Sequence, residues 1–310
     1  MNVQQISKTY GERTVLHPLD LSIRSNEQLA IIGETGSGKT TLLRALAGLL
    51  DLTSGEITFR GERVVGPSEQ LLPGHTSISY LNQAVHLRNH YKVKDLLERH
   101  SIQEEHADWA LAKLCRIELL MHRMTDQLSG GERQRIALAI ELSKHPAVLL
   151  LDEPFSNLDM GHRHTLRSVL DDLNRQQGMT IVIVSHNPSE ILGWADRVIV
   201  MRKGKCVQVG TPRDIYEMPA DEYVAQLLGQ YNRIERIDEP GAVIIRPERI
   251  SFVPMASSSH QGLITYKEFE GATYLYSVRV DEEMYFVRTG RADLQVGQKV
   301  GIFIDLKQSS

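Results

Sequence analysis

An eight-residue glycine-rich segment, GETGSGKT at residues 33–40, constrains this chain more than any other feature. It fits the phosphate-loop pattern G-x-x-x-x-G-K-[ST] at every fixed position. A mostly apolar run at residues 28–32 precedes it and a helical pattern at residues 41–47 follows it, which is the strand, loop and helix order of such a site. A Gly/Ser-rich turn that binds nothing would not need these neighbours. The segment therefore predicts an α/β protein that binds a nucleoside triphosphate.

Each residue type in this loop has a part in holding a triphosphate. Glycines let the backbone turn so that its N–H groups converge on phosphate oxygens, and the next helix points its positive dipole end at the same anion. Lys39 would reach the β- and γ-phosphates, Thr40 would supply a hydroxyl to Mg²⁺, and Thr41 would add one near the α-phosphate. The predicted nucleotide-binding residues of the loop are Gly33, Glu34, Thr35, Gly36, Ser37, Gly38, Lys39, Thr40 and Thr41.

Length and composition narrow the possible settings of this site. With 310 residues the chain suits one large and one small domain. Cys115 and Cys206 lie far apart without a C-x-x-C pattern, which argues against a disulfide framework or zinc site and fits a reducing compartment. The amino terminus lacks the form of a signal peptide, and the apolar runs are far shorter than the roughly 18 residues of a spanning helix. A net charge of −4, with both signs mixed along the chain, does not indicate the basic patch that nucleic-acid binding requires. Any membrane role is therefore expected to go through a partner protein.

Alternation and apolar runs indicate how the first two thirds of the chain fold. Residues 3–24 and residues 56–65 each alternate around turn signals and predict antiparallel β pairs. Continuous apolar runs at residues 148–151 and 180–184 are typical of strands buried on both faces of a parallel sheet, and a helical stretch at residues 163–177 separates them. The predicted core is an α/β fold with an antiparallel β edge.

Changes in composition and apolar spacing along the chain predict its domains. We expect a nucleotide-binding domain over residues 1–230, with a helical subdomain inserted at about residues 84–145. Residues 231–310 contain short β runs separated by turns, without a convincing helix, and predict a small all-β, barrel-like domain.

A second motif, VLLLDEP at residues 148–154, supplies the carboxylates that a nucleotide site needs. The apolar strand places Asp152 and Glu153 at the carboxyl edge of the sheet, where ligands bind in open α/β folds. Asp152 is expected to hold Mg²⁺, and Glu153 to polarise the water that attacks the γ-phosphate. An acidic helix cap is the alternative for such a pair, but the upstream phosphate loop favours the catalytic interpretation.

A second anion-binding element is predicted at LSGGERQR, residues 128–135. Ser129, Gly130 and Gly131 precede a good helix, so their N–H groups would be free at a helix N-terminus. With the phosphate loop, this segment resembles the LSGGQ signature of the ATP-binding cassette (ABC) ATPases, except that Glu132 stands at the fifth position. The resemblance implies a P-loop NTPase fold of the ABC type. It also implies a head-to-tail homodimer in which the signature of one copy faces the ATP held by the other.

The resemblance assigns further residues by their place in the family pattern. Tyr10 corresponds to the aromatic residue that stacks on adenine, and Gln83 to the glutamine that senses Mg²⁺ and the γ-phosphate. His186 follows the strand at residues 180–185, where the family has a histidine that contacts the γ-phosphate, so Gln83 and His186 join Glu153 as predicted catalytic residues. Residues 156–159, SNLD, resemble the loop that contacts the opposite subunit.

Other histidines carry no spacing typical of metal ligands, and His162 and His164 are expected on a solvated helix face. Residues 84–91, after Gln83, lack the Phe-Pro sequence common in the family's importers. Because this face would meet the permease, the departure leaves the cargo open.

The C-terminal part of the chain favours one of the three functions that are compatible with the cassette. Residues 210–229 resemble the segment that closes the cassette in importers of iron, polyamine and sugar type, and residues 245–250, IRPERI, resemble the start of their OB-like TOBE domain. The resemblance implies an ATP-hydrolysing importer subunit, with Mg²⁺ as cofactor, on the cytoplasmic face of the inner membrane. Its expected partners are a transmembrane permease, a second copy of itself and an extracytoplasmic solute-binding protein, with no direct contact to nucleic acid. A non-transport ATPase acting on ribosomes or nucleic acid is the alternative, and a ligand-sensing C-terminal domain is the third possibility.

Overall fold

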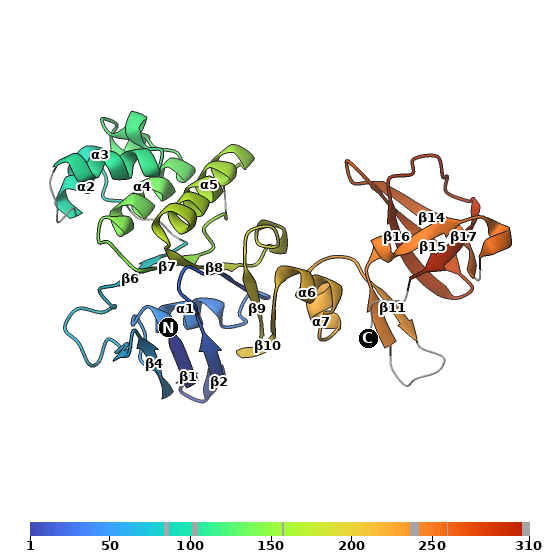
Figure 1. Ribbon diagram of the computed structural model, residues 1–310, viewed down its shortest axis with the longest axis horizontal. Helices are drawn as coiled ribbons and strands as arrows, with labels where there is room; N and C mark the ends of the chain where they lie inside the picture. Colours follow the sequence, from blue (N-terminus) through green and yellow to red (C-terminus); the bar gives the residue numbers. More distant parts are fainter. Residues whose placement is uncertain (84–86, 101–104, 157, 236–241, 259, 306–310) are drawn as a thin grey trace. The chain divides into compact units, whose positions relative to one another are not determined.

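The computed structural model describes residues 1–83, 87–100, 105–156, 158–235, 242–258 and 260–305 (Figure 1). The chain divides into two compact units, Met1–Pro212 and Arg213–Ser310. No helix in these described ranges is long and apolar enough to cross a membrane.

A six-stranded sheet forms the centre of the first unit. Five of its strands run parallel, and the last strand pairs antiparallel with its neighbour. In spatial order the strands are β10 (Lys205–Gly210), β9 (Arg197–Arg202), β3 (Gln28–Ile32), β8 (Thr180–Ser185), β7 (Val148–Asp152) and β6 (Ile78–Leu81). The two continuous apolar runs are thus adjacent central strands, β7 and β8, as the sequence predicts.

The amino-terminal part of this unit forms a second, antiparallel sheet. Its strands, in spatial order, are β2 (Arg13–Ser22), β1 (Asn2–Tyr10), β4 (Ser54–Phe59) and β5 (Glu62–Arg63). Both predicted β pairs are therefore confirmed as antiparallel hairpins.

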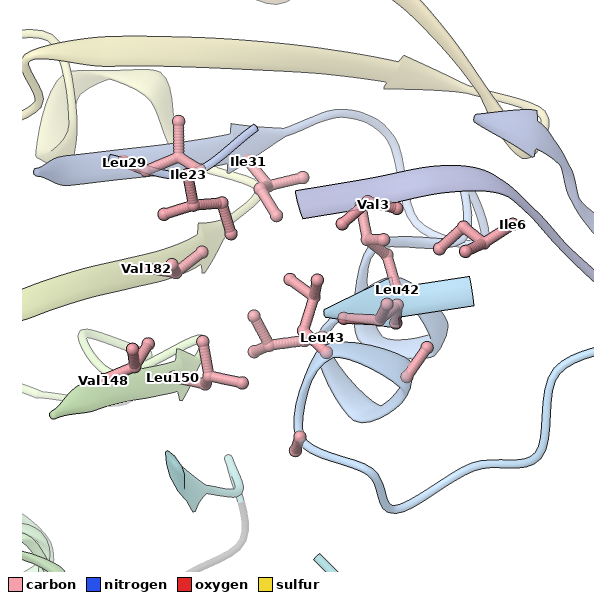
Figure 2. Close-up of a cluster of buried hydrophobic side chains, with 14 of the residues drawn as sticks. Val3, Ile6, Ile23, Leu29, Ile31, Leu42, Leu43, Val148, Leu150 and Val182 are labelled. Carbon is pink, nitrogen blue, oxygen red and sulfur yellow. The ribbon is translucent and has the colours of Figure 1, made fainter. Parts of the chain in front are cut away.

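The helix that follows the phosphate loop joins the two sheets. Helix α1 (Lys39–Leu46) directs Leu42 and Leu43 into one apolar cluster with Val3 of β1 and Leu150 of β7 (Figure 2). All four side chains are buried, and full burial of a leucine stabilises the fold by roughly 2 kcal/mol. The start of α1, and with it the phosphate loop, is thereby anchored on both sheets.

The remaining helices of the first unit gather on the other side of the six-stranded sheet (Figure 1). They are α2 (Val93–His100), α3 (Glu105–Leu114), α4 (Gly130–Leu142) and α5 (Met160–Gln177), with the 3₁₀ turns η1 (Glu118–Leu120), η2 (Thr125–Gln127) and η3 (Pro188–Glu190). Helix α5 begins three residues before the predicted helical stretch because the carboxylate of Asp159 accepts the N–H of His162 and caps it.

The second unit is built mainly from β-strands, in agreement with the predicted all-β fold. A five-stranded antiparallel sheet in the order β13-β17-β14-β15-β16 packs around a core that includes Ile264, Tyr276, Val278 and Ile302. The elements of this unit are α6 (Pro212–Glu217), α7 (Glu222–Leu227), β11 (Asn232–Glu235), β12 (Ala242–Ile245), η4 (Pro247–Arg249), β13 (Ile250–Val253), η5 (Met255–Ser257), β14 (His260–Phe269), β15 (Tyr274–Val280), β16 (Glu283–Thr289) and β17 (Lys299–Ile304).

The second unit begins at Arg213, upstream of the domain boundary near residue 230 that the sequence predicts. A buried side chain of the β unit, Arg246, explains the difference. Its guanidinium donates to the carbonyl oxygens of Tyr216 (2.8 Å) and Ala225 (2.9 Å) and lies 4.2 Å from the centre of the Tyr216 ring. These contacts tie α6 and α7 to the strands that follow, while the boundary at 230 stays a prediction.

Candidate nucleotide site

The phosphate loop leaves the carboxyl end of β3 and enters α1 in a shape that only glycine permits at two positions. Gly33 has φ 154°, and a Cβ there would lie 2.2 Å from the carbonyl oxygen of Met201. Gly38 has φ 99° and precedes α1, and a Cβ there would lie 2.9 Å from the carbonyl oxygen of Val15. Neighbouring strands thus hold the loop closely, and a side chain at either glycine would displace it.

Lys39 lies buried beneath this loop, with 6% of its surface exposed. Its ammonium donates to the carbonyl oxygens of Gly33 (2.8 Å) and Glu34 (2.9 Å). Burial lowers the pKa of Lys39, and the nearby carboxylates of Glu153, Asp152 and Glu34 oppose that shift. A buried cation whose hydrogen bonds, among the described residues, go to neutral carbonyls is suited to a phosphate oxygen.

A hydroxyl and a carboxylate meet beside the loop. Thr40 Oγ1 donates to Asp152 Oδ1 over 3.1 Å, and the Tyr80 hydroxyl donates to Asp152 Oδ2 over 3.1 Å. Asp152 is buried, and burial raises its pKa although the two hydrogen bonds oppose the rise. Hydroxyl and carboxylate oxygens are the ligands that Mg²⁺ prefers, so Thr40 and Asp152 fit this ion.

No motif marks Tyr80 in the sequence. Tyr80 lies in β6, the strand that pairs with β7, and it precedes Gln83 by three residues.

Glu153 and His186 meet at the carboxyl ends of the adjacent strands β7 and β8. His186 Nδ1 lies 2.7 Å from Glu153 Oε2, and the Glu153 N–H donates to the carbonyl oxygen of Val184 over 2.9 Å. Glu153 has φ 50°, an uncommon conformation for a side chain other than glycine. The structure therefore brings together the predicted base and the predicted γ-phosphate contact, and their roles stay predictions.

Gln83 and the segment after Glu153 are also close. The Gln83 amide donates to Ser156 Oγ over 3.5 Å, and the Ser156 hydroxyl donates to the carbonyl oxygen of Glu153 over 2.8 Å. Gln134 of α4 donates to the carbonyl oxygen of Pro154 in the same turn. Residue 157 of the predicted subunit-contact loop, and residues 84–86 after Gln83, lie outside the described residues.

Tyr10, the predicted adenine-stacking residue, lies at the end of β1 in the β1–β2 hairpin. Half of its surface is exposed, and the ammonium of Lys8 lies 4.9 Å from the centre of its ring. An exposed aromatic face is available there for stacking, and this role also stays a prediction.

The signature segment begins α4 with reciprocal capping hydrogen bonds. The Glu132 N–H donates to Ser129 Oγ (3.3 Å), and the Ser129 N–H donates to Glu132 Oε2 (2.8 Å). Burial opposes ionisation of Glu132, but the hydrogen bonds that its carboxylate accepts from the N–H and the hydroxyl of Ser129, with the charges of Arg123 and Arg135, outweigh it, so its pKa lies below the usual value. Glutamate at the fifth signature position therefore keeps the capping arrangement that glutamine would give.

The contacts of His162 correct the expectation that it lies on a solvated helix face. Its Nδ1 lies 2.8 Å from Asp159 Oδ2, and its Nε2 lies 3.4 Å from Ser129 Oγ. A Cβ on Gly131 would lie 2.5 Å from the imidazole ring. His164, two residues on, is exposed as expected. No sequence pattern indicates the His162 contacts, because Ser129 lies 33 residues away.

Comparisons with known proteins agree with this geometry. The ABC transporter family model matches residues 16–156, and the TOBE domain model matches residues 243–307. These matches contain the phosphate loop, the signature and the two carboxylates, together with most of the second unit.

Individual relatives match over most of their length. The chain is 34% identical to a sulfate/thiosulfate import ATP-binding protein of Pectobacterium atrosepticum, covering 91% of this chain and 88% of the relative. It is 33% identical to a spermidine/putrescine import ATP-binding protein of Haemophilus ducreyi, covering 97% and 94%. The solved structure of cbiO1 from Clostridium perfringens, part of the ABC transporter complex cbiONQ, aligns with a TM-score of 0.63 and 26% identity over 69% of this chain and 89% of that one. The chain therefore belongs to the ABC transporter family, as an ATP-binding subunit of the importer type with a C-terminal TOBE domain.

Proposed function

We propose that this subunit binds and hydrolyses ATP to drive the import of a solute through a separate transmembrane permease. The observation that carries the proposal is the meeting of Lys39, Asp152, Glu153 and His186 at the carboxyl edge of one parallel sheet. The importing relatives support the transport reading.

The phosphate loop prepares Lys39 to hold the triphosphate. Its ammonium donates to the carbonyl oxygens of Gly33 and Glu34, and both bonds are exchangeable for phosphate oxygens. Because the cation is already desolvated, its attraction to an incoming anion is stronger than it would be in water. Thr40 and Asp152 would hold Mg²⁺, which supplies positive charge to the β- and γ-phosphates.

Glu153 and His186 would act on the attacking water and the γ-phosphate. The carboxylate of Glu153 accepts a hydrogen bond from His186 Nδ1, which keeps both side chains turned to the same point at the sheet edge. Glu153 orients the water and accepts its proton, while His186 contacts the γ-phosphate. Gln83, connected to this turn through Ser156, would sense the γ-phosphate and Mg²⁺.

The signature segment would complete the site of a second copy of the chain. Ser129 bonds to Glu132 and His162 of its own chain, and its helix presents N–H groups to an anion. Two copies arranged head to tail would each close the other's ATP. We place this dimer on the cytoplasmic face of the membrane, bound to the permease and served by an extracytoplasmic solute-binding protein. Because the importing relatives carry names as different as sulfate and spermidine, we assign cargo choice to those partners.

Two variants test the proposal. Lys39→Ala is expected to lose tight ATP binding, since the only buried cation described beneath the loop is removed. Glu153→Gln is expected to keep binding, lose at least about 100-fold in turnover and accumulate as an ATP-bound dimer in light scattering. Full hydrolysis by Glu153→Gln would contradict the assigned base. Purification of the wild-type chain with a multi-spanning permease is expected, whereas stable recovery with ribosomes or DNA would favour the non-transport alternative.

A further inference from the structure

His162 contacts three residues that belong to two different functional segments of the same chain. It follows the loop at residues 156–159 and stands in the first turn of α5. Its ring lies against Gly131 and within 3.4 Å of Ser129, at the start of α4. Only 30% of its side chain is exposed. The imidazole thus fills the space between the start of α5 and the start of α4.

The chemistry of Asp159 determines which nitrogen of His162 carries the proton. Hydrogen bonds from His162 lower the pKa of Asp159, so its carboxylate is ionised and only accepts hydrogen bonds. The nitrogen 2.8 Å from it, Nδ1, must therefore carry a proton and donate. In the neutral ring Nε2 is then an acceptor that lies 3.4 Å from the Ser129 hydroxyl, and the carboxylate of Glu132 is a second acceptor for the same hydroxyl. Asp159 thereby selects the ring tautomer in which His162 offers an acceptor to the Ser129 hydroxyl.

The same loop is bonded to the hydrolytic centre at its other end. The Ser156 hydroxyl donates to the carbonyl oxygen of Glu153, and Gln83 donates to Ser156. The ring is tightly placed, because a Cβ at Gly131 would already overlap it.

We propose that His162 is a positioning residue that orients the hydroxyl of the signature serine, Ser129, of its own chain. This inference rests on the proposed dimer, in which Ser129 acts on the ATP of the second copy. The contacts that carry it are those of the His162 ring with Asp159 and Ser129.

A double-mutant cycle tests the connection. His162→Leu keeps the approximate size of the side chain and removes both nitrogens. We expect it to lower kcat/KM for ATP about five-fold, the effect of one lost hydrogen bond. In a Ser129→Ala background the same change is expected to lower kcat/KM less than about two-fold, since the acceptor no longer has a donor to orient. His164→Leu, an exposed position on the same helix, serves as the matched control and should leave kcat/KM unchanged.

Two further measurements separate this inference from general damage to the fold. Binding of a fluorescent ATP analogue to the His162→Leu chain should equal wild type, because His162 contacts none of the phosphate-loop residues in the contacts described above. His162→Leu should also show the wild-type melting temperature within about 2 °C. Equal losses of kcat/KM in the wild-type and Ser129→Ala backgrounds, or weaker binding of the analogue, would contradict the positioning role.

The dimer itself is checked separately. In a Glu153→Gln background with His162 intact, ATP should produce a dimer. If that dimer forms and the cycle is additive, the role of His162 is wrong and the proposed function stands. If no dimer forms with His162 intact, the proposed function fails first, and the inference falls with it.

Discussion

Asp152 is a buried carboxylate, and burial disfavours its ionised form in the nucleotide-free chain. Burial raises its pKa above the ordinary 3.8, so the protonated form is favoured in the folded state relative to the unfolded one. Its contribution to stability is therefore full below pH 3.8 and is lost as the pH rises through the raised value. At neutral pH the ionised side chain therefore weakens the nucleotide-free fold.

The predicted consequence is that Asp152→Asn stabilises the nucleotide-free chain. The gain in melting temperature, measured in a chelator without nucleotide, should grow as the pH rises from about 4 and then level off. Asp293→Asn is the matched control, since hydrogen bonds from Arg291 lower the pKa of Asp293. That contribution is present above the ordinary pKa and lost at lower pH, so its variant should show no gain at neutral pH. A gain for Asp152→Asn that shrinks as the pH rises would contradict this account.

Residues of the site differ in how far sequence alone reveals them. The phosphate loop, Asp152 and Glu153 lie in short contiguous motifs whose chemistry is local, and the structure brings them together with His186. Tyr80 reaches Asp152 across 72 residues and His162 reaches Ser129 across 33, so their partners are set by strand order and helix packing. A single sequence contains no periodic signal for such pairs.

At the scale of single elements, the start of α4 depends on its capping box. Glu132→Gln should change the free energy of unfolding by less than about 0.5 kcal/mol, because glutamine can accept the same hydrogen bond from the Ser129 N–H. Glu132→Ala should lose about 1 kcal/mol in urea unfolding. Equal stability of the two variants would show that the reciprocal bond contributes nothing.

Helices α6 and α7 depend on Arg246 in a similar way. Arg246→Met should lower the free energy of unfolding of the second unit by about 3 kcal/mol, because the carbonyl oxygens of Tyr216 and Ala225 lose their donor. Arg291→Met, which removes an exposed ion pair with Asp293, should change it by less than about 0.5 kcal/mol. Protease cleavage between residues 213 and 230 should accelerate only in the Arg246 variant, and equal cleavage in both would contradict the contact's role.

Strands with continuous or alternating apolar residues can be predicted from the sequence. The central strands β7 and β8 and the hairpins at residues 3–24 and 56–65 are confirmed. The contact of helices α6 and α7 with the following strands has no sequence signal, because the bond that forms it comes from Arg246, 30 residues after Tyr216.

For the whole molecule, the proposed function requires two copies of the chain for each complete ATP site. The phosphate loop and carboxylates lie together, whereas Ser129 bonds to Glu132 and His162 of its own chain. The sequence predicts this division only through the family resemblance, because a second copy leaves no mark in the pattern of one chain.

Mixing two inactive variants tests whether each ATP site is shared between two copies of the chain. Lys39→Ala breaks the phosphate loop, and Gly130→Asp places a negative charge at the signature, where a Cβ meets no atom within 4 Å and the fold is kept. Each variant alone should hydrolyse almost no ATP, because both sites of its dimer are defective. The mixture should recover up to about a quarter of wild-type ATPase activity, since half of the randomly formed dimers carry one intact site. A mixture no more active than the mean of its two components would contradict the shared site.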